Sequence, residues 1–157
     1  MAIEKAMFGA GCFWGVEMAY ASMDGVVSTK VGYSGGVVQD PTYRQVCTGQ
    51  TGHAEVILIE FDSDQISFQA LLDKLFEIHD PTTLNRQGPD IGTQYRSAVF
   101  FYDEVQQKQA ESTIEALNAS GSFKGPIVTE ISPAKTFYAA EDYHQKYFER
   151  NPVSCHV

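Results

Sequence analysis

The chain has 157 residues, 43% of them hydrophobic, which suffices for one well-buried core and is too short for two comfortable domains. Its 20 acidic residues outnumber 11 basic ones, and the resulting formal charge of −9 makes nucleic acid and anionic membranes poor partners. No stretch approaches the roughly 18 to 20 apolar residues of a membrane span, and the first residues do not form a convincing signal peptide. We therefore expect one soluble, cytoplasmic domain.

The first strong pattern lies at residues 5–15. Residues 5–10 form a short apolar run that suits a strand, and a helical spacing follows it. The helical positions are Trp14, Met18 and Ser22. Cys12 therefore falls at a predicted strand-to-helix turn, where unpaired N–H groups and the helix dipole favour a thiolate. Phe13 and Trp14 could wall an apolar pocket beside the sulfur, but this stretch alone leaves open a buried structural cysteine among core aromatics.

A second strand is predicted at residues 26–33, and loops follow to residue 52. The run at 54–61 is apolar almost throughout, which predicts a central strand covered on both faces. Alternation puts Glu55 on the face of Ile57 and Ile59. If that face is shielded from water, the pKa of the carboxyl rises and Glu55 stays protonated near neutral pH, ready to donate a proton. A strand-end glutamate that faces solvent is the alternative.

The second half continues the alternation of strands and helices. Its expected elements are a helix from residue 68 capped by Ser67, a loop at 82–93, a strand at 98–102, a helix to residue 118 opened by Asp103 and Gln106 as a capping box, a strand at 127–131 and a short helix at 141–150. The expected class is therefore α/β (α+β), a single domain with a central mixed sheet and helices packed on it.

Several loop residues could act with the cysteine. The hydroxyls of Tyr43 and Tyr95 donate well to an oxygen acceptor. Asp90 could accept or relay a hydrogen bond, although loop aspartates usually fix turns. His53 or His144 could pair with Cys12, and no local signature selects one of them. A cysteine hydrolase or acyl transferase therefore remains open, as does a module that binds methionine-like side chains without catalysis.

The three cysteines are scattered along the chain and form no C-x-x-C pair. This pattern argues against a zinc site and against a secreted disulfide framework. We expect free thiols, no metal and no cofactor. Cys47 is expected to serve as a small hydrophobic residue without a catalytic role.

Six motifs together resemble the type A peptide methionine sulfoxide reductases (MsrA). They are Gly11-Cys12-Phe13-Trp14-Gly15, Gly32-Tyr33-Ser34-Gly35-Gly36, Pro41-Thr42-Tyr43-Arg44, Thr51-Gly52-His53-Ala54-Glu55, Gly92-Thr93-Gln94-Tyr95-Arg96-Ser97 and Ala140-Glu141-Asp142-Tyr143-His144-Gln145. The resemblance covers nearly the whole chain, in order. It implies an α/β fold with a central mixed sheet, and the reduction of the S epimer of methionine sulfoxide, free or in proteins, as a repair of oxidised methionine.

The resemblance also implies a role for each matching residue. Cys12 is the nucleophile and Glu55 the acid, Phe13 and Trp14 shape the pocket for the substrate methyl, and Tyr43, Tyr95 and Asp90 join the hydrogen bonds around the sulfoxide oxygen. The chemistry agrees with these roles, because a sulfoxide carries a polar oxygen and an apolar methyl on one sulfur. Its site needs donors beside an aromatic wall, and an acid for the charge that develops on the oxygen.

The end of the sequence carries Cys155, the third residue from the last. We expect residues 1–150 to form the catalytic domain and residues 151–157 a mobile tail, in which Cys155 resolves a sulfenic acid on Cys12 as a disulfide. The resemblance suggests thioredoxin as the reductant. Longer members of the family carry a glycine-rich tail, sometimes with another recycling cysteine, so we expect no relay of three thiols here. We further expect a monomer.

Overall fold

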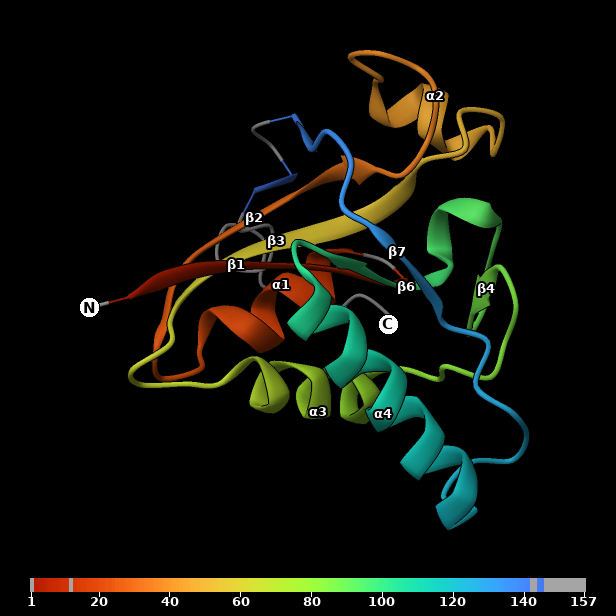
Figure 1. Ribbon diagram of the computed structural model, residues 1–157. Helices are drawn as coiled ribbons and strands as arrows, with labels where there is room; N and C mark the ends of the chain where they lie inside the picture. The colour runs from red at the N-terminus through yellow and green to blue at the C-terminus, as the bar shows by residue number, and fades with distance from the viewer. Residues whose placement is uncertain (1, 12, 142–143, 146–157) are drawn as a thin grey trace.

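The computed structural model describes residues 2–11, 13–141 and 144–145. A six-stranded sheet in the order β7-β6-β1-β3-β2-β8 forms its centre (Figure 1). Its strands are β1 (Ile3–Ala10), β2 (Val26–Ser34), β3 (Ala54–Asp62), β6 (Ser97–Phe101), β7 (Glu130–Pro133) and β8 (Tyr138–Ala139). Only β6 and β7 pair in parallel among these strands, and the other neighbours are antiparallel. The predicted mixed sheet is therefore confirmed.

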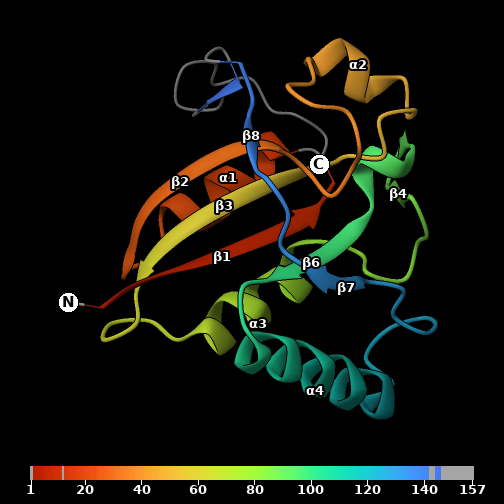
Figure 2. The same ribbon diagram turned by 45° about the horizontal axis from the view of Figure 1, so that its top comes forward.

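The helices are α1 (Phe13–Ala21), α2 (Tyr43–Cys47), α3 (Phe68–Ile78) and α4 (Glu104–Ser120), with a 3-10 turn η1 (Thr93–Tyr95). Three of them, α1, α3 and α4, cover one face of the sheet (Figure 1). The segment between β7 and β8 crosses the opposite face (Figure 2). Two short strands, β4 (Arg86–Gln87) and β5 (Asp90–Ile91), form a separate hairpin. Within the described ranges, no helix is both long enough and apolar enough to cross a membrane.

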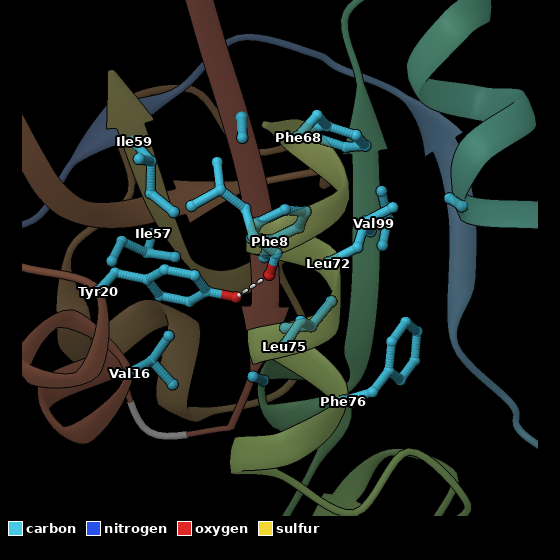
Figure 3. Packing of buried hydrophobic residues seen from close by; sticks show 14 of the residues in the cluster. Phe8, Val16, Tyr20, Ile57, Ile59, Phe68, Leu72, Leu75, Phe76 and Val99 are labelled. Atoms are coloured by element: carbon cyan, nitrogen blue, oxygen red, sulfur yellow. Dashed lines mark hydrogen bonds between the residues drawn. The ribbon is translucent and has the colours of Figure 1, made fainter. Parts of the chain in front are cut away.

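The main core lies between the sheet and the three helices (Figure 3). Ile57, Ile59 and Phe61 of β3 enter it, and Val56, directly before Ile57, packs into the smaller core on the other face. Both faces of β3 are therefore covered, as its continuous apolar sequence predicts. Tyr20 of α1 also lies in the main core, where its hydroxyl donates a hydrogen bond of 2.8 Å to the carbonyl oxygen of Leu71.

The predicted face of the first helix is wrong. The side chain of Met18 is 61% exposed, whereas the buried positions of α1 are Phe13, Val16, Glu17 and Tyr20. This helix is apolar nearly all round, so its sequence periodicity could not identify the side that packs on the sheet. Helix α3, whose apolar stripe is sharply one-sided, begins after its Ser67 cap and buries the residues that the stripe predicts.

Four other expectations need correction. Residues 43–47 form α2 inside the expected loop, and its signal was the capping box of Thr42 and Gln45. The strand expected at 127–131 is β7, at 130–133. Asp103 caps α4, but the carbonyl oxygen of the Gln106 side chain accepts from the backbone N–H of Tyr102, so the reciprocal half of the expected box is not made. The hairpin β4–β5 and the strand β8 were not expected.

Two further expectations fall wholly or mostly outside the described residues. These are the helix at 141–150 and the tail at 151–157. The boundary at residue 150 therefore stays a prediction.

Candidate active site

The sheet topology brings the candidate segments to one end. Strand β1 ends at Ala10, which pairs with Ser97 at the start of antiparallel β6. Ser34 at the end of β2 pairs with Ala54 at the start of β3. Four segments that are far apart in the sequence therefore meet at the same end of the sheet. They are the turn after β1, the loop that leads to α2, the start of β3 and the turn before β6.

Glu55 lies at this end of the sheet and is buried. Its side chain is 1% exposed, and Oε1 accepts a hydrogen bond of 3.3 Å from the backbone N–H of Phe13, the first residue of α1. Among the residues that the structure describes, no group hydrogen-bonds to Oε2. Burial raises the pKa of Glu55 to about 8; the hydrogen bond from Phe13 opposes this rise and the charge of Asp90 adds to it. The solvent-facing alternative for this glutamate is therefore wrong, and Glu55 is largely neutral at pH 7.

Five rings form an aromatic cluster beside Glu55. They are Phe13, Trp14, Tyr33, Tyr43 and His144. The centroid of His144 lies 4.4 Å from that of Tyr43 and 5.3 Å from that of Phe13. Phe13 is 1% exposed, whereas Trp14 is half-buried. Phe13 therefore lies in the buried part of the aromatic cluster and Trp14 at its accessible side. The role of both residues as the wall of a substrate pocket stays a prediction.

Hydrogen bonds fix the rings of the aromatic cluster. The indole Nε1 of Trp14 donates to Nδ1 of His144 at 3.0 Å. The Glu141 carboxylate accepts from the Tyr33 hydroxyl at 3.0 Å and from the backbone N–H of Tyr43 at 3.1 Å. Although partial burial acts to raise the pKa of Glu141, these hydrogen bonds lower it below its ordinary value. Glu141 is therefore an anion that anchors the start of α2, a role that its sequence position did not indicate.

Tyr43 and Tyr95 come together at Cys47. Hydrogen bonds from both hydroxyls act to lower the pKa of the Cys47 thiol, but burial outweighs them and raises it. Burial and the charge of Glu55 also raise the pKa of Tyr43, which keeps its hydroxyl a proton donor. Cys47 is an exposed free thiol. This exposed position beside two hydroxyls does not support its expected service as a small hydrophobic residue, and its lack of a catalytic role stays a prediction.

Arg96 ties three segments of the site together. Its Nε donates to Oε1 of Glu130 at 2.9 Å, Nη1 to the carbonyl of Thr93 at 2.9 Å, and Nη2 to the carbonyl of Gly52 at 3.0 Å. The η1 turn, the approach to β3 and the start of β7 are thereby held on one planar guanidinium. The sequence analysis missed this residue, because its three partners are brought together only by the sheet.

The histidine alternatives find little support. Both ring nitrogens of His53 bind loop backbone: Nδ1 accepts from the N–H of Gly36 at 3.0 Å, and Nε2 lies 2.6 Å from the carbonyl oxygen of Val38. His144 uses Nδ1 to accept from Trp14. His53 is thus not arranged as the base of a thiol–imidazole pair. A pair between His144 and Cys12 involves a residue outside the described ranges and stays untested. Within the described part of the chain, no group of three His, Cys, Asp or Glu residues could hold a metal ion.

Cys12 and Cys155 lie outside the described residues, so their predicted roles remain predictions. The six other candidates are brought to the same end of the sheet, either through direct contacts or, for Asp90, through its charge on Glu55. The site combines a neutral carboxyl group, phenol hydroxyls and an aromatic cluster next to the first residue of α1, Phe13. It can donate hydrogen bonds and a proton to an oxygen whose neighbouring group is apolar.

Known proteins are similar to this chain in sequence and in fold. Residues 4–157 match the family described as peptide methionine sulfoxide reductase. The peptide methionine sulfoxide reductase MsrA of Methanothermobacter thermautotrophicus is 58% identical over 149 residues, which cover 95% of this chain and 88% of that protein. Reduced Mxr1 of Saccharomyces cerevisiae superposes with a TM-score of 0.91 at 38% identity, over 98% of this chain and 88% of that one. Mxr1 in complex with Trx2 gives a TM-score of 0.65 at 27% identity, over 92% and 84% of the two chains.

Proposed function

Because this chain belongs to the peptide methionine sulfoxide reductase family and is an enzyme of the MsrA type, we propose that it reduces the S epimer of methionine sulfoxide, free or in proteins, with Cys12 as the nucleophile and Glu55 as the acid. The observation that carries the acid role is the environment of Glu55. Its Oε2 atom is buried and has no hydrogen-bond partner among the described residues, and its pKa is raised to about 8. A neutral carboxyl in that state has a proton to give and an unfilled hydrogen-bonding position.

The proposed reduction transfers one oxygen atom and two electrons. The Cys12 thiolate attacks the sulfoxide sulfur while Glu55 protonates the oxygen, so that no free oxide anion has to leave. The hydroxyl then moves from the substrate sulfur to the Cys12 sulfur while the bond between the two sulfurs breaks, which releases the thioether and leaves Cys12 as a sulfenic acid. The thiolate sulfur is oxidised by two electrons and the substrate sulfur is reduced by two. Solvent returns the proton to Glu55.

The aromatic cluster fits the apolar half of this substrate. Trp14 is its accessible side, and its indole is held by His144. A methyl group bound there leaves the sulfoxide oxygen to the polar side, where Glu55 and the hydroxyls of Tyr43 and Tyr95 can donate to it. Because the methyl and the oxygen occupy different sides of one sulfur, a site with a fixed apolar wall and fixed donors accepts one epimer.

Recycling needs a second thiol and an external reductant. Attack by the Cys155 thiol on the sulfenic acid forms a Cys12–Cys155 disulfide and releases water. A dithiol of the thioredoxin class then reduces that disulfide by exchange. The yeast protein Mxr1, which this chain resembles, has been crystallised with Trx2, and this supports thioredoxin as the reductant here.

The direct test uses racemic methyl p-tolyl sulfoxide with dithiothreitol and chiral chromatography of what remains. The wild type should consume the S enantiomer alone. Cys12→Ser should consume neither. Loss of both enantiomers, or activity retained in Cys12→Ser, would exclude the proposed mechanism. Hydrolysis of activated esters without loss of sulfoxide would support the hydrolase alternative instead.

The resolving step is tested by peptide mapping after one turnover without reductant. The wild type should yield one thioether per protein and a Cys12–Cys155 disulfide. In Cys155→Ser the single turnover should persist, and the sulfenic acid should be trapped by dimedone. A disulfide between Cys12 and Cys47, with Cys155 still free, would show that the tail does not resolve the intermediate.

A further inference from the structure

Gln87 of β4 packs against the turn that precedes α1. A Cβ atom placed on Gly11 would lie 2.7 Å from Cγ and 2.9 Å from Cβ of Gln87. Gly11 also has a φ of +93°, which other residues rarely adopt. The aliphatic part of Gln87 therefore contacts the backbone of the residue immediately before Cys12, and this contact requires a glycine there.

The amide of the same side chain is clamped to the chain that leaves α3. Oε1 of Gln87 accepts from the backbone N–H of Asp80, and Nε2 donates to the carbonyl of Asp80, both at 2.8 Å. Two opposed hydrogen bonds to one backbone residue leave the amide no freedom to rotate. Gln87 thus connects the turn at Gly11 to the end of α3.

Gln87 is also the strand partner of Asp90. The two residues pair across the β4–β5 hairpin, with Gly88 and Pro89 between them. The charge of Asp90 is one of the causes that raise the pKa of Glu55. A displacement of Gln87 would therefore change the position of the turn at Gly11 and of the Asp90 hairpin.

A cavity lies beside the contact between Gln87 and the turn at Gly11, so that neighbouring side chains do not back this contact. Its volume is about 110 Å³, and Gln87 lines it together with Ala10, Gly15, Val16 and Ile78. Shortening Gln87 would enlarge this existing void, because no neighbouring side chain already fills the space. The turn between β1 and α1 would then lose its support on this side.

We propose that Gln87 is a positioning residue that holds the turn at Gly11 and the Asp90 hairpin in fixed relation to Glu55. The proposal rests on the proposed function, because it concerns the groups that carry out the sulfoxide reduction. Gln87 itself touches no reacting atom in this account and acts through Gly11 and Asp90. Its effect should be large for a residue outside the reaction, since misplacing reacting groups by about 1 Å can cost about 100-fold in rate.

Two variants separate the contributions of packing and hydrogen bonding. Gln87→Met keeps the length of the side chain and its contact with Gly11 but removes both bonds to Asp80. Gln87→Ala removes the packing as well. Gln69→Met is the matched control, because the side chain of Gln69 in α3 also makes two hydrogen bonds, to Asp73 and Thr113, away from the site. The single-turnover rate should fall about 10-fold in Gln87→Met and about 100-fold in Gln87→Ala, while the control stays within about twofold of the wild type.

The second readout is the pKa of the Cys12 thiol, which loss of stability in a folded protein would not change. It is measured by iodoacetamide alkylation against pH, with the Cys12 peptide quantified by mass spectrometry. In Gln87→Ala the pKa should rise, because a displaced turn at Gly11 weakens the stabilisation of a thiolate by the nearby N-terminus of α1. If Gln87→Ala does not fold, Gln87→Met decides by the same two measurements. Wild-type rate and thiol pKa in a folded Gln87 variant, or an equal loss in Gln69→Met, would overturn the proposal. A wild type that fails to turn over once would instead refute the proposed function.

Discussion

Replacing Glu55 by Gln should change the pH dependence of stability in a way that can be calculated from the structure. Burial raises the pKa of Glu55 from 4.5 to about 8. Between these values the folded protein keeps a proton that the unfolded chain has released, so the stability of the wild type falls as pH rises. The loss is about 1.4 kcal/mol per pH unit and about 5 kcal/mol in total. Glu55→Gln has no group to titrate, so it should escape this loss.

The two proteins should therefore have similar free energies of unfolding near pH 5, and Glu55→Gln should be the more stable by about 4 kcal/mol at pH 8. Urea unfolding from pH 5 to 8 measures this difference, with the fluorescence of Trp14, the single tryptophan of the chain, as the probe. Glu60→Gln, on the same strand but half-buried, still contains Glu55 and should keep the pH slope of the wild type. A stability difference between Glu55→Gln and the wild type that does not change with pH would refute the buried neutral carboxyl.

Three other substitutions have specific expected outcomes. Trp14→Ala should raise the KM for sulfoxide more than it lowers the melting temperature, because the indole is half-buried; a collapse of stability with an unchanged KM would restore the core interpretation. Arg96→Met removes three hydrogen bonds from a guanidinium and should lower the free energy of unfolding, measured in urea, by about 3 kcal/mol or more. A loss below about 1 kcal/mol would contradict the proposal that Arg96 holds the three segments together. Tyr43→Phe should slow the single-turnover reduction about 10-fold without loss of stability, since only a hydroxyl donor is removed, and an unchanged rate would exclude that donor.

The sequence was most informative where one property repeats along an element. The apolar run of β3 identified a strand covered on both faces, and the alternation within it placed Glu55 on the face of Ile57 and Ile59. The one-sided stripe of α3 predicted its buried residues for the same reason. Helix α1 is apolar nearly all round, so only packing against the sheet decides that Val16 is buried and Met18 exposed.

The parts of the site that sequence reasoning missed depend on contacts between distant segments. Arg96 binds backbone 44 residues before it and a carboxylate 34 residues after it. Gln87 reaches Gly11 only because the β4–β5 hairpin folds back on the end of α3. Local patterns carry no trace of such pairings, whereas the five-residue helix α2 did have a local signal in the spacing of Thr42 and Gln45.

The most direct test of the account is the pH dependence of the single-turnover reduction of the S sulfoxide between pH 6 and 9.5. The reaction requires neutral Glu55, whose pKa is raised to about 8. The wild-type rate should therefore fall about tenfold per pH unit well above pH 8. Glu55→Gln should be slower by about 100- to 10,000-fold near neutral pH and should lack this alkaline limb. A wild-type rate that keeps rising to pH 9.5, or a near-normal rate in Glu55→Gln at neutral pH, would contradict the role of Glu55 as the acid.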